Sequence, residues 1–355
     1  MHHLARQARG FLLLPLLIAC AVGATPAVAG EFMFMPTLAV VKERHQADNN
    51  PGIKKNQVIG DLFYSNDLEH LRFLGELQID KDGQDMERLQ AGWRLNPTHT
   101  VWFGRYHNPI GYWNVEHHHG HYMETSAERP RILEFEDEGG PLPIHLFGLL
   151  LQGTQAIGDA GLQYDLGVAS GPKIKGDEFE PVDVIRHPTL NKLALVARLA
   201  YRPDATRDDQ YGVFLARTRI PVEDLSFTQV DQNLAGIYIS RDIGRLRLFG
   251  EAMRITHQLS QNAGAEWPSY WAGYIQAEYK LVPNVWTPFA RQESISSRLT
   301  KDYTDLFPGL PKQRQLAGMR WDFYKDQALK FELIRDQTVG GVTFDTLEIQ
   351  WSAMF

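Results

Sequence analysis

Apolar and polar residues alternate along most of this chain, and its last segment shows the alternation most clearly. From position 346 to the end, one set of positions is polar and the other is apolar: Thr346, Glu348, Gln350 and Ser352 against Leu347, Ile349, Trp351, Ala353 and Phe355. The same period of two recurs at 71–79, 88–95, 192–201 and 317–323. Successive side chains of a strand point to opposite faces, so the pattern predicts β-strands and almost no helix.

Strand length separates two classes of β protein that both alternate. A soluble sandwich also has a polar and an apolar face, but its strands run about five to six residues. Here the alternating segments run about ten residues, the length of a tilted strand that crosses a bilayer. Closure into a barrel pairs every backbone donor and acceptor, as lipid requires. The sequence therefore predicts an all-β fold, a transmembrane antiparallel β-barrel.

Aromatic residues support this prediction because they gather near the ends of the expected strands. Such residues form the interfacial girdles of membrane barrels. The members are Tyr201, Tyr211, Tyr279, Trp286, Phe323, Tyr324, Trp351 and Phe355.

The pattern predicts about sixteen strands, with fourteen or eighteen as alternatives because the first, second and fifth are weakly patterned. The expected ranges are 33–44, 58–65, 69–79, 86–95, 99–107, 144–156, 161–169, 190–202, 209–219, 230–240, 244–256, 270–281, 285–294, 314–323, 326–337 and 343–355. Short turns alternate with longer loops at 45–57, 108–143, 170–189, 220–229, 257–269 and 295–313. The segment 108–143 follows the fifth expected strand, so it is the third external loop and the longest connection.

The N-terminus has the features of a secretory signal peptide at 1–29, which leaves the barrel at 30–355. Arg6 and Arg9 precede an apolar run, and Ala27-Val28-Ala29 supplies small residues for cleavage. Leu17 to Cys20 also resembles a bacterial lipobox, in which cleavage before Cys20 would leave a lipidated cysteine. We favour cleavage after Ala29 because its site follows directly.

Composition excludes several other classes. Cys20 is the one cysteine of the chain, so a mature chain without it has no disulfide, thiolate metal site or covalently held haem. Mean hydropathy is −0.32, and no later segment has the apolar length of a membrane helix. Enzyme motifs are absent, since Ser170 to Lys173 fits S-x-x-K by letters only and its Gly-Pro pair breaks the required helix. We expect no enzyme, no cofactor and no nucleic-acid partner.

Together, the signal segment, the alternating strands and the terminal Phe355 resemble a Gram-negative outer-membrane porin of the general-porin type, over the whole mature chain. The resemblance implies location in the outer membrane, where a terminal aromatic residue serves barrel insertion. It also implies contact with outer-membrane lipid, passive diffusion of small hydrophilic solutes or ions, and a homotrimer. In porins of sixteen strands, the third external loop folds back into the barrel and narrows the channel.

The third loop carries an acidic stretch that resembles the constriction loop of general porins. Its members are Glu134, Glu136, Asp137 and Glu138, and the candidate opposing wall residues are Arg72, Arg88 and Arg94. Carboxylates that face arginines across a narrow channel would create a transverse field and, with the acidic excess, a modest cation preference. The alternative is that these charges only solvate the lumen and pair with one another. The full chain has a formal net charge of −7.

A histidine cluster in the same loop is a candidate metal site. His117, His118, His119 and His121 lie near Glu116 and Glu124, and imidazole with carboxylate suits Zn²⁺, Cu²⁺ or Ni²⁺. A contiguous run on a loop does not guarantee fixed geometry, so a structural or pH-responsive role is an equal alternative.

Three functions remain in competition. The first is a passive water-filled pore. The second is a sheath or scaffold that surrounds a partner, such as an electron-transfer protein. The third is an outer-membrane hydrolase whose catalytic residues come from distant strands.

Overall fold

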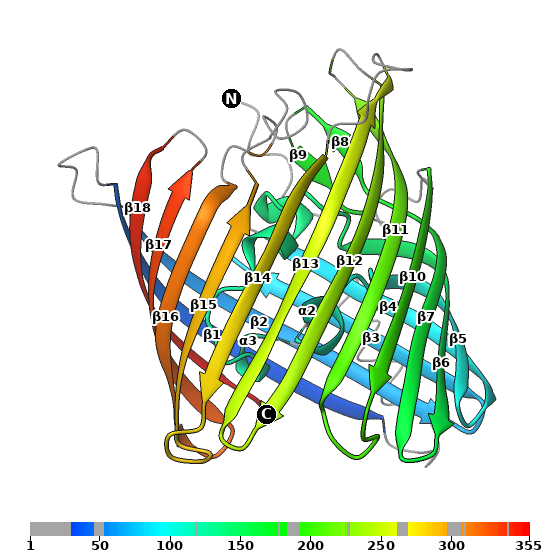
Figure 1. The fold of residues 1–355 in the computed structure, drawn as a ribbon, viewed down its shortest axis with the longest axis horizontal. Helices are drawn as coiled ribbons and strands as arrows, with labels where there is room; N and C mark the ends of the chain where they lie inside the picture. The colour runs from blue at the N-terminus through cyan, green and yellow to red at the C-terminus, as the bar shows by residue number, and fades with distance from the viewer. Residues whose placement is uncertain are drawn as a thin grey trace.

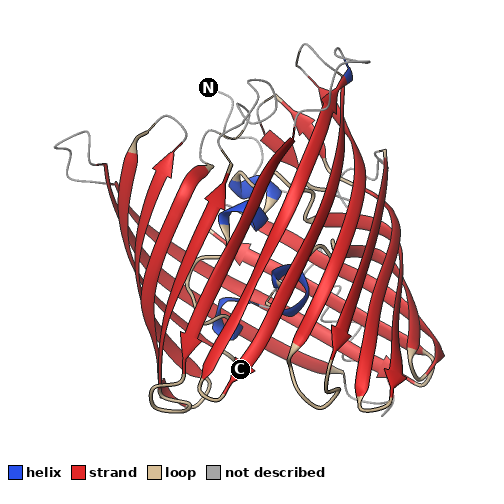
Figure 2. Ribbon diagram, in the orientation of Figure 1, coloured by secondary structure: helices blue, strands red, loops and turns tan. Residues whose placement is uncertain are grey.

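The structure, a computed structural model, describes residues 30–45, 53–81, 83–117, 120–176, 178–182, 192–223, 225, 228–260, 269–296, 307, 310–338 and 341–355. Within these ranges sixteen strands form one closed antiparallel barrel (Figures 1 and 2). Two further short strands, β8 and β9, form a hairpin beside β11. The predicted barrel and its sixteen strands are therefore confirmed.

The strand bounds lie close to the predicted ranges. They are β1 Glu31–His45, β2 Ile53–Leu68, β3 Leu71–Asp80, β4 Gln84–Asn96, β5 His99–His107, β6 His145–Ile157, β7 Ala160–Ser170, β8 Lys173–Lys175, β9 Glu178–Glu180, β10 Leu193–Arg202, β11 Gln210–Glu223, β12 Gln229–Ile243, β13 Leu246–Leu259, β14 Ser269–Tyr279, β15 Trp286–Ile295, β16 Pro311–Tyr324, β17 Gln327–Thr338 and β18 Thr343–Ala353. Two expected loops are shorter than predicted, because β2 already begins at Ile53 and β11 continues to Glu223. The hairpin β8–β9 lies in the expected loop 170–189 and was not predicted.

The two ends of the chain close the barrel against each other. β1 pairs antiparallel with β18, in the register Thr37 to Ser352. Beyond that ladder, the backbone N–H groups of Phe34 and Phe355 each donate to the other residue's carbonyl oxygen at 2.9 Å. Phe355 is thus part of the closing seam, and its side chain remains 67% exposed.

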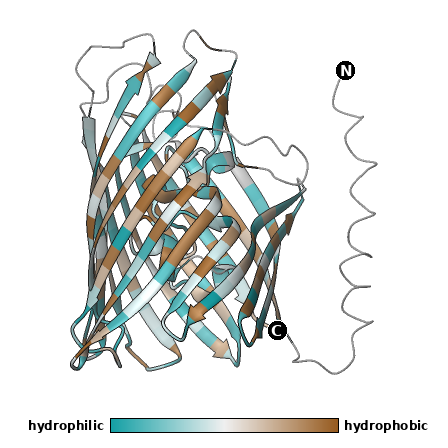
Figure 3. Cartoon of the chain, turned by 90° about the vertical axis from the view of Figure 1, so that its right-hand side faces the viewer, coloured by the Kyte–Doolittle hydropathy of each residue, from teal (hydrophilic) through white to brown (hydrophobic). Residues whose placement is uncertain are grey.

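Alternation sorts the side chains as the sequence predicts. On β18, Leu347 and Ile349 point outward with about two fifths of their surface exposed, whereas Glu348 and Gln350 are 1% exposed on the inner side. Figure 3 shows the resulting stripes of hydropathy along the strands. An apolar outer face with polar groups inside is the arrangement that a lipid environment favours.

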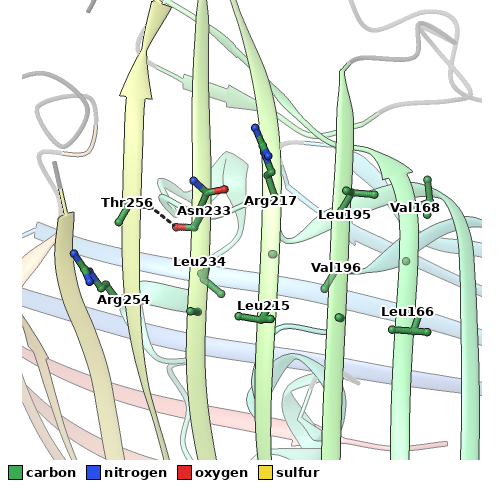
Figure 4. A pocket seen from close by; sticks show the side chains of 14 residues that line it. Leu166, Val168, Leu195, Val196, Leu215, Arg217, Asn233, Leu234, Arg254 and Thr256 are labelled. Carbon is green, nitrogen blue, oxygen red and sulfur yellow. Dashed lines mark hydrogen bonds between the residues drawn. The ribbon is translucent and has the colours of Figure 1, made fainter. Parts of the chain in front are cut away.

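The outer wall has one broad groove, of about 630 Å³, across β7 and β10 to β13 (Figure 4). Exposed aliphatic side chains such as Leu166 and Leu215 line it, and Arg217, Asn233 and Arg254 lie at one edge. Because these exposed side chains point away from the lumen, the groove is a feature of the lipid-facing surface.

The long connection between β5 and β6 lies inside the barrel. It contains two short helices, α2 (Trp113–Glu116) and α3 (Gly120–Met123), which Figure 2 shows within the ring of strands. Two 3-10 turns follow, at Arg131–Leu133 and Glu136–Glu138. No helix of the described residues is long and apolar enough to cross a membrane. We call residues 108–144 the inner segment.

The outward position of Leu333 on β17, 64% exposed, allows a test of the lipid-facing surface. Leu333→Arg should lower the free energy of unfolding in lipid by about 2–4 kcal/mol, because a charge near the bilayer midplane is costly. Equilibrium unfolding in liposomes measures the change. Leu281→Arg is the matched control, since Leu281 is 50% exposed but follows the end of β14. Equal effects of the two substitutions would contradict the assigned faces.

Candidate functional site

Inward carboxylates on the wall hold the backbone of the inner segment. Glu251 on β13 accepts hydrogen bonds from the backbone N–H groups of Tyr112 at 2.9 Å and Trp113 at 2.7 Å. The Tyr274 hydroxyl donates to the same oxygen at 2.8 Å. Gly111 has a φ of 79°, and a Cβ there would lie 1.8 Å from Glu251 Oε2, so only glycine permits this approach. Hydrogen bonds to a charged group are stronger than neutral ones, so Glu251 is a firm anchor.

Two more carboxylates repeat this arrangement farther around the barrel. Glu332 on β17 accepts from the backbone N–H groups of Ala127 at 3.1 Å and Glu128 at 3.0 Å. Glu293 on β15 accepts from the N–H of Arg131 at 2.7 Å. The inner segment is therefore tied to alternate strands along one half of the wall.

Inward cations hold the carbonyl groups of the same segment. Arg320 on β16 donates to the carbonyl oxygens of Tyr122 at 2.6 Å and Glu124 at 2.7 Å. Lys330 on β17 donates to the carbonyl oxygens of His121 and Ser126. Because wall charges of both signs bind its backbone, the inner segment has a fixed position in the lumen.

Apolar packing fills the lumen beside the Glu251 anchor and from there toward β5. Tyr112 and Trp113 are each 1% exposed and pack on Phe249, with ring centroids 5.5 and 6.1 Å away. Ile132 and Leu133 are equally buried and belong to the same cluster, which extends across β5 to β14. This part of the lumen is a packed core.

A cavity of about 90 Å³ lies between the inner segment and strands β2, β3, β4 and β18, and we call it the acidic gap. That volume holds a few water molecules. Its charged lining consists of Asp61, Glu76, Glu87, Glu124, Glu128, Glu134, Glu138, Glu348 and Arg129, with His121 as a further titratable group. Carboxylates therefore dominate the charged lining of the acidic gap.

Burial changes the titration of the inner-segment groups that face the gap. Burial raises the pKa of the Glu124 carboxyl to about 7, although Lys330, Arg129 and Arg291 oppose this change. Burial also acts on Glu134, but Arg131 and Arg129 hold its pKa below the ordinary value. Burial lowers the pKa of His121 to about 4, so this imidazole is neutral at pH 7. Glu124 is thus an inner-segment carboxyl that titrates near neutral pH.

Among the four acidic residues proposed for the constriction, the described side chains have two different surroundings. Glu134 and Glu138 line the acidic gap, and Glu134 pairs with Arg131 at 3.0 Å. Glu136 is 1% exposed and pairs instead with the ring of His145 at 2.8 Å. The side chain of Asp137 lies outside the described residues.

The three proposed wall arginines do not form one cluster. Nη2 of Arg94 donates to both carboxylate oxygens of Asp67, at 2.6 and 2.7 Å. Arg72 lies 3.4 Å from the same carboxylate, beside the β2–β3 turn. Arg88 pairs with Glu76 at 2.6 Å, at the edge of the acidic gap. Arg72 and Arg88 thus pair with an acidic residue on the adjacent strand, and Arg94 reaches Asp67 across β3.

The proposed histidine cluster is divided between two surroundings. His117 packs among aromatic rings, with centroids 5.0 Å from Trp113 and 5.2 Å from Phe249. His121 lies in α3 at the acidic gap. His118 and His119 lie outside the described residues.

Sequence reasoning did not single out another group of side chains. Glu87 on β4, His107 at the end of β5 and His145 at the start of β6 are all buried, and their potential ligand atoms lie within 4.8 Å of one another. A clue was present, since the two histidines border the inner segment on either side. Glu87 was hidden because strict alternation places it on the outward face with Leu89.

Comparison with known proteins finds similarity in fold only. No protein-family profile and no curated protein sequence matches this chain. Among solved structures, the chain is similar to an anion-selective porin from Comamonas acidovorans, with a TM-score of 0.62 and 12% identity over 93% of this chain and 100% of that one. It is also similar to OmpF of Salmonella typhi in complex with daunomycin, with a TM-score of 0.58 and 12% identity over 92% and 98%.

A third similar structure is the outer-membrane channel DcaP of Acinetobacter baumannii. Its TM-score is 0.57, with 11% identity over 94% of this chain and 99% of that one. Together with the closed sixteen-strand barrel, these likenesses show that the chain has the fold of outer-membrane porins.

The anchors of the inner segment predict the effect of Glu251→Ala. The substitution removes hydrogen bonds to a charged group worth about 1.5–3 kcal/mol each. Amide hydrogen exchange at Tyr112 and Trp113 should therefore accelerate by at least about tenfold. Glu69→Ala is the control, since the Glu69 side chain is 90% exposed in the β2–β3 turn. Unchanged exchange in Glu251→Ala would show that the segment does not depend on this anchor.

Proposed function

We propose that this chain is a narrow channel of the Gram-negative outer membrane, through which small hydrophilic solutes, and small cations most readily, diffuse passively. The observation that carries the proposal is the acidic gap, a polar cavity between the wall and the inner segment of a closed, apolar-faced barrel. A signal peptide at 1–29, removed on export, is part of the proposal.

The charges of the gap support cation preference. Eight carboxylates and one arginine line it, and several carboxylates already have partners on the wall, as Glu76 has Arg88. In a narrow space with low-dielectric walls, the remaining negative charge lowers the energy of a cation and raises that of an anion. Salt screens charges at the mouths more strongly than those at the narrowest point.

The size of the gap supports small solutes. A space of about 90 Å³ admits a few waters or a partly hydrated ion. Larger solutes need displacement of the inner segment, which the anchors Glu251, Glu293 and Glu332 oppose. We therefore expect a small unitary conductance.

The inner segment also weighs against the sheath function. A barrel that surrounds a protein partner needs an open lumen, whereas here the inner segment contacts wall residues from β1 to β18. The fold likeness is to porins, so a channel is favoured over a hydrolase. Because one similar protein, OmpT of Vibrio cholerae, was solved in a trimer form, a homotrimer in outer-membrane lipid completes the proposal.

Neutralising two gap carboxylates of the inner segment tests cation preference. Glu134→Gln combined with Glu138→Gln removes their negative charge and should shift the reversal potential in a salt gradient toward anions, with a several-fold loss of cation preference at low salt. Planar-bilayer recording measures this shift. The charge-matched control is Glu180→Gln with Glu223→Gln, at the exposed hairpin where both carboxylates pair with Lys173. Equal shifts in the two variants would refute the gap as the selective point.

Glu124 predicts a pH dependence of the same property. A carboxyl whose pKa is about 7 is neutral below that pH and negative above it. Cation preference should therefore rise as pH increases from about 5.5 to about 8.5. In Glu124→Gln, reversal potentials should stay nearly constant over this range. A variant that retains the wild-type pH profile would show that another group titrates.

A further inference from the structure

The cluster Glu87, His107 and His145 lies where the inner segment joins the wall. His107 and His145 are directly opposite each other in the β5–β6 ladder, and their rings lie 5.1 Å apart at 68°. Glu87 reaches both rings from β4, where it lies in a β-bulge. On either side of it, Arg88 is opposite Glu76 of β3 and Met86 is opposite Leu77 of β3. The bulge leaves Glu87 without an opposite residue on β3 and turns it away from the outward face.

The distances within the cluster suit a metal ion. Glu87 Oε2 lies 2.6 Å from His145 Nε2, and the ligand atoms of all three residues lie within 4.8 Å of one another. Zinc bonds of about 2.0–2.2 Å place neighbouring ligands of a tetrahedral site about 3.3–3.6 Å apart. Side-chain movements of about 1 Å would therefore convert the cluster into a three-ligand site with one position left for water.

Glu136 supplies the outer support that such sites require. Its Oε2 accepts from His145 Nδ1 at 2.8 Å, which directs Nε2 toward Glu87. Its Oε1 accepts from the backbone N–H groups of Ile144 at 2.6 Å and His145 at 2.8 Å, so the carboxylate itself is fixed. A carboxylate behind a histidine in this way sets the ring orientation and raises its basicity as a ligand.

Charge and access agree with a cation at this place. Arg105 and Arg129 are arginines near Glu87. Two more carboxylates lie beside the cluster: Glu136 is paired with His145, and Glu76 is paired with Arg88. A metal ion would replace the proton between His145 and Glu87. Because that proton leaves, the net charge of the cluster rises by one unit less than the charge of the ion. Glu87 also lines the acidic gap, which gives a hydrated cation a route to the cluster.

We propose that Glu87, His107 and His145 bind one divalent transition-metal ion of the zinc class, with Glu136 as the positioning residue of His145. Two imidazoles and a carboxylate favour such ions over Ca²⁺ or Mg²⁺, which prefer oxygen ligands. The ion links β4 to both ends of the inner segment, and it thereby stabilises the position of this segment in the lumen.

Metal binding to the purified, folded barrel in detergent tests the proposal directly. Titration with Co²⁺, followed by its visible absorption and by displacement with Zn²⁺, should give one site per chain. His107→Gln and Glu87→Gln should each weaken binding at least tenfold, and Glu136→Gln by about 10–100-fold. His118→Ala with His119→Ala is the matched control, and it should bind as the wild type does.

X-ray absorption of the zinc-loaded wild-type protein should report two imidazole nitrogens and at least one carboxylate oxygen. Absence of a site in the wild type, or loss of binding only in the His118→Ala/His119→Ala variant, would overturn the proposal. Migration on unheated gels shows whether each variant is folded. If a variant is not folded, the X-ray absorption spectrum of the zinc-loaded wild type decides whether the proposed ligands bind the metal. None of these readouts needs ion conduction, so failure of the metal site and failure of the channel proposal are distinguishable.

Discussion

Every strand in the wall of this barrel meets lipid on one side, and lipid offers no hydrogen bond to a peptide group. The ladder must therefore close on itself, and the pairing of β1 with β18 completes it. The bonds between Phe34 and Phe355 extend that seam to the last residue. Once the wall is closed, polar side chains point inward, and the inward charges become the partners of whatever lies in the lumen.

Several of those inward charged side chains form hydrogen bonds with the backbone of the inner segment. Carboxylates on β13, β15 and β17 bind N–H groups of the inner segment, and cations on β16 and β17 bind its carbonyl groups. The short helices of the segment leave many backbone N–H and C=O groups without helical hydrogen-bond partners. Side chains of the wall are the partners of several of these groups. Acidic side chains of the segment then remain available to face the gap, as Glu134 and Glu138 do.

The strands of the wall could be predicted from the sequence because the alternation indicates which face each residue occupies, as Leu347 and Glu348 illustrate. The interior was not readable to the same depth. Period two places Glu87 beside Leu89 on the outer face, and only the bulge opposite Glu76 and Leu77 turns it inward. Arg72 and Arg94 belong by pattern to the lumen, but the pattern has no information on height along the barrel, so their shared pairing with Asp67 was not foreseeable. Contacts such as Glu251 with Trp113 depend on a loop path that no local periodicity encodes.

The anchoring of the inner segment has a consequence for how the protein forms. The N–H of Ala127 bonds to Glu332, 205 positions later in the chain, and Trp113 bonds to Glu251, 138 positions later. Contacts so distant in sequence form slowly, because a long stretch of chain must be ordered first. The segment is translated early but acquires its partners only when β13 to β17 are in place. The lumen can therefore acquire its full set of contacts only after the C-terminal half of the wall has formed.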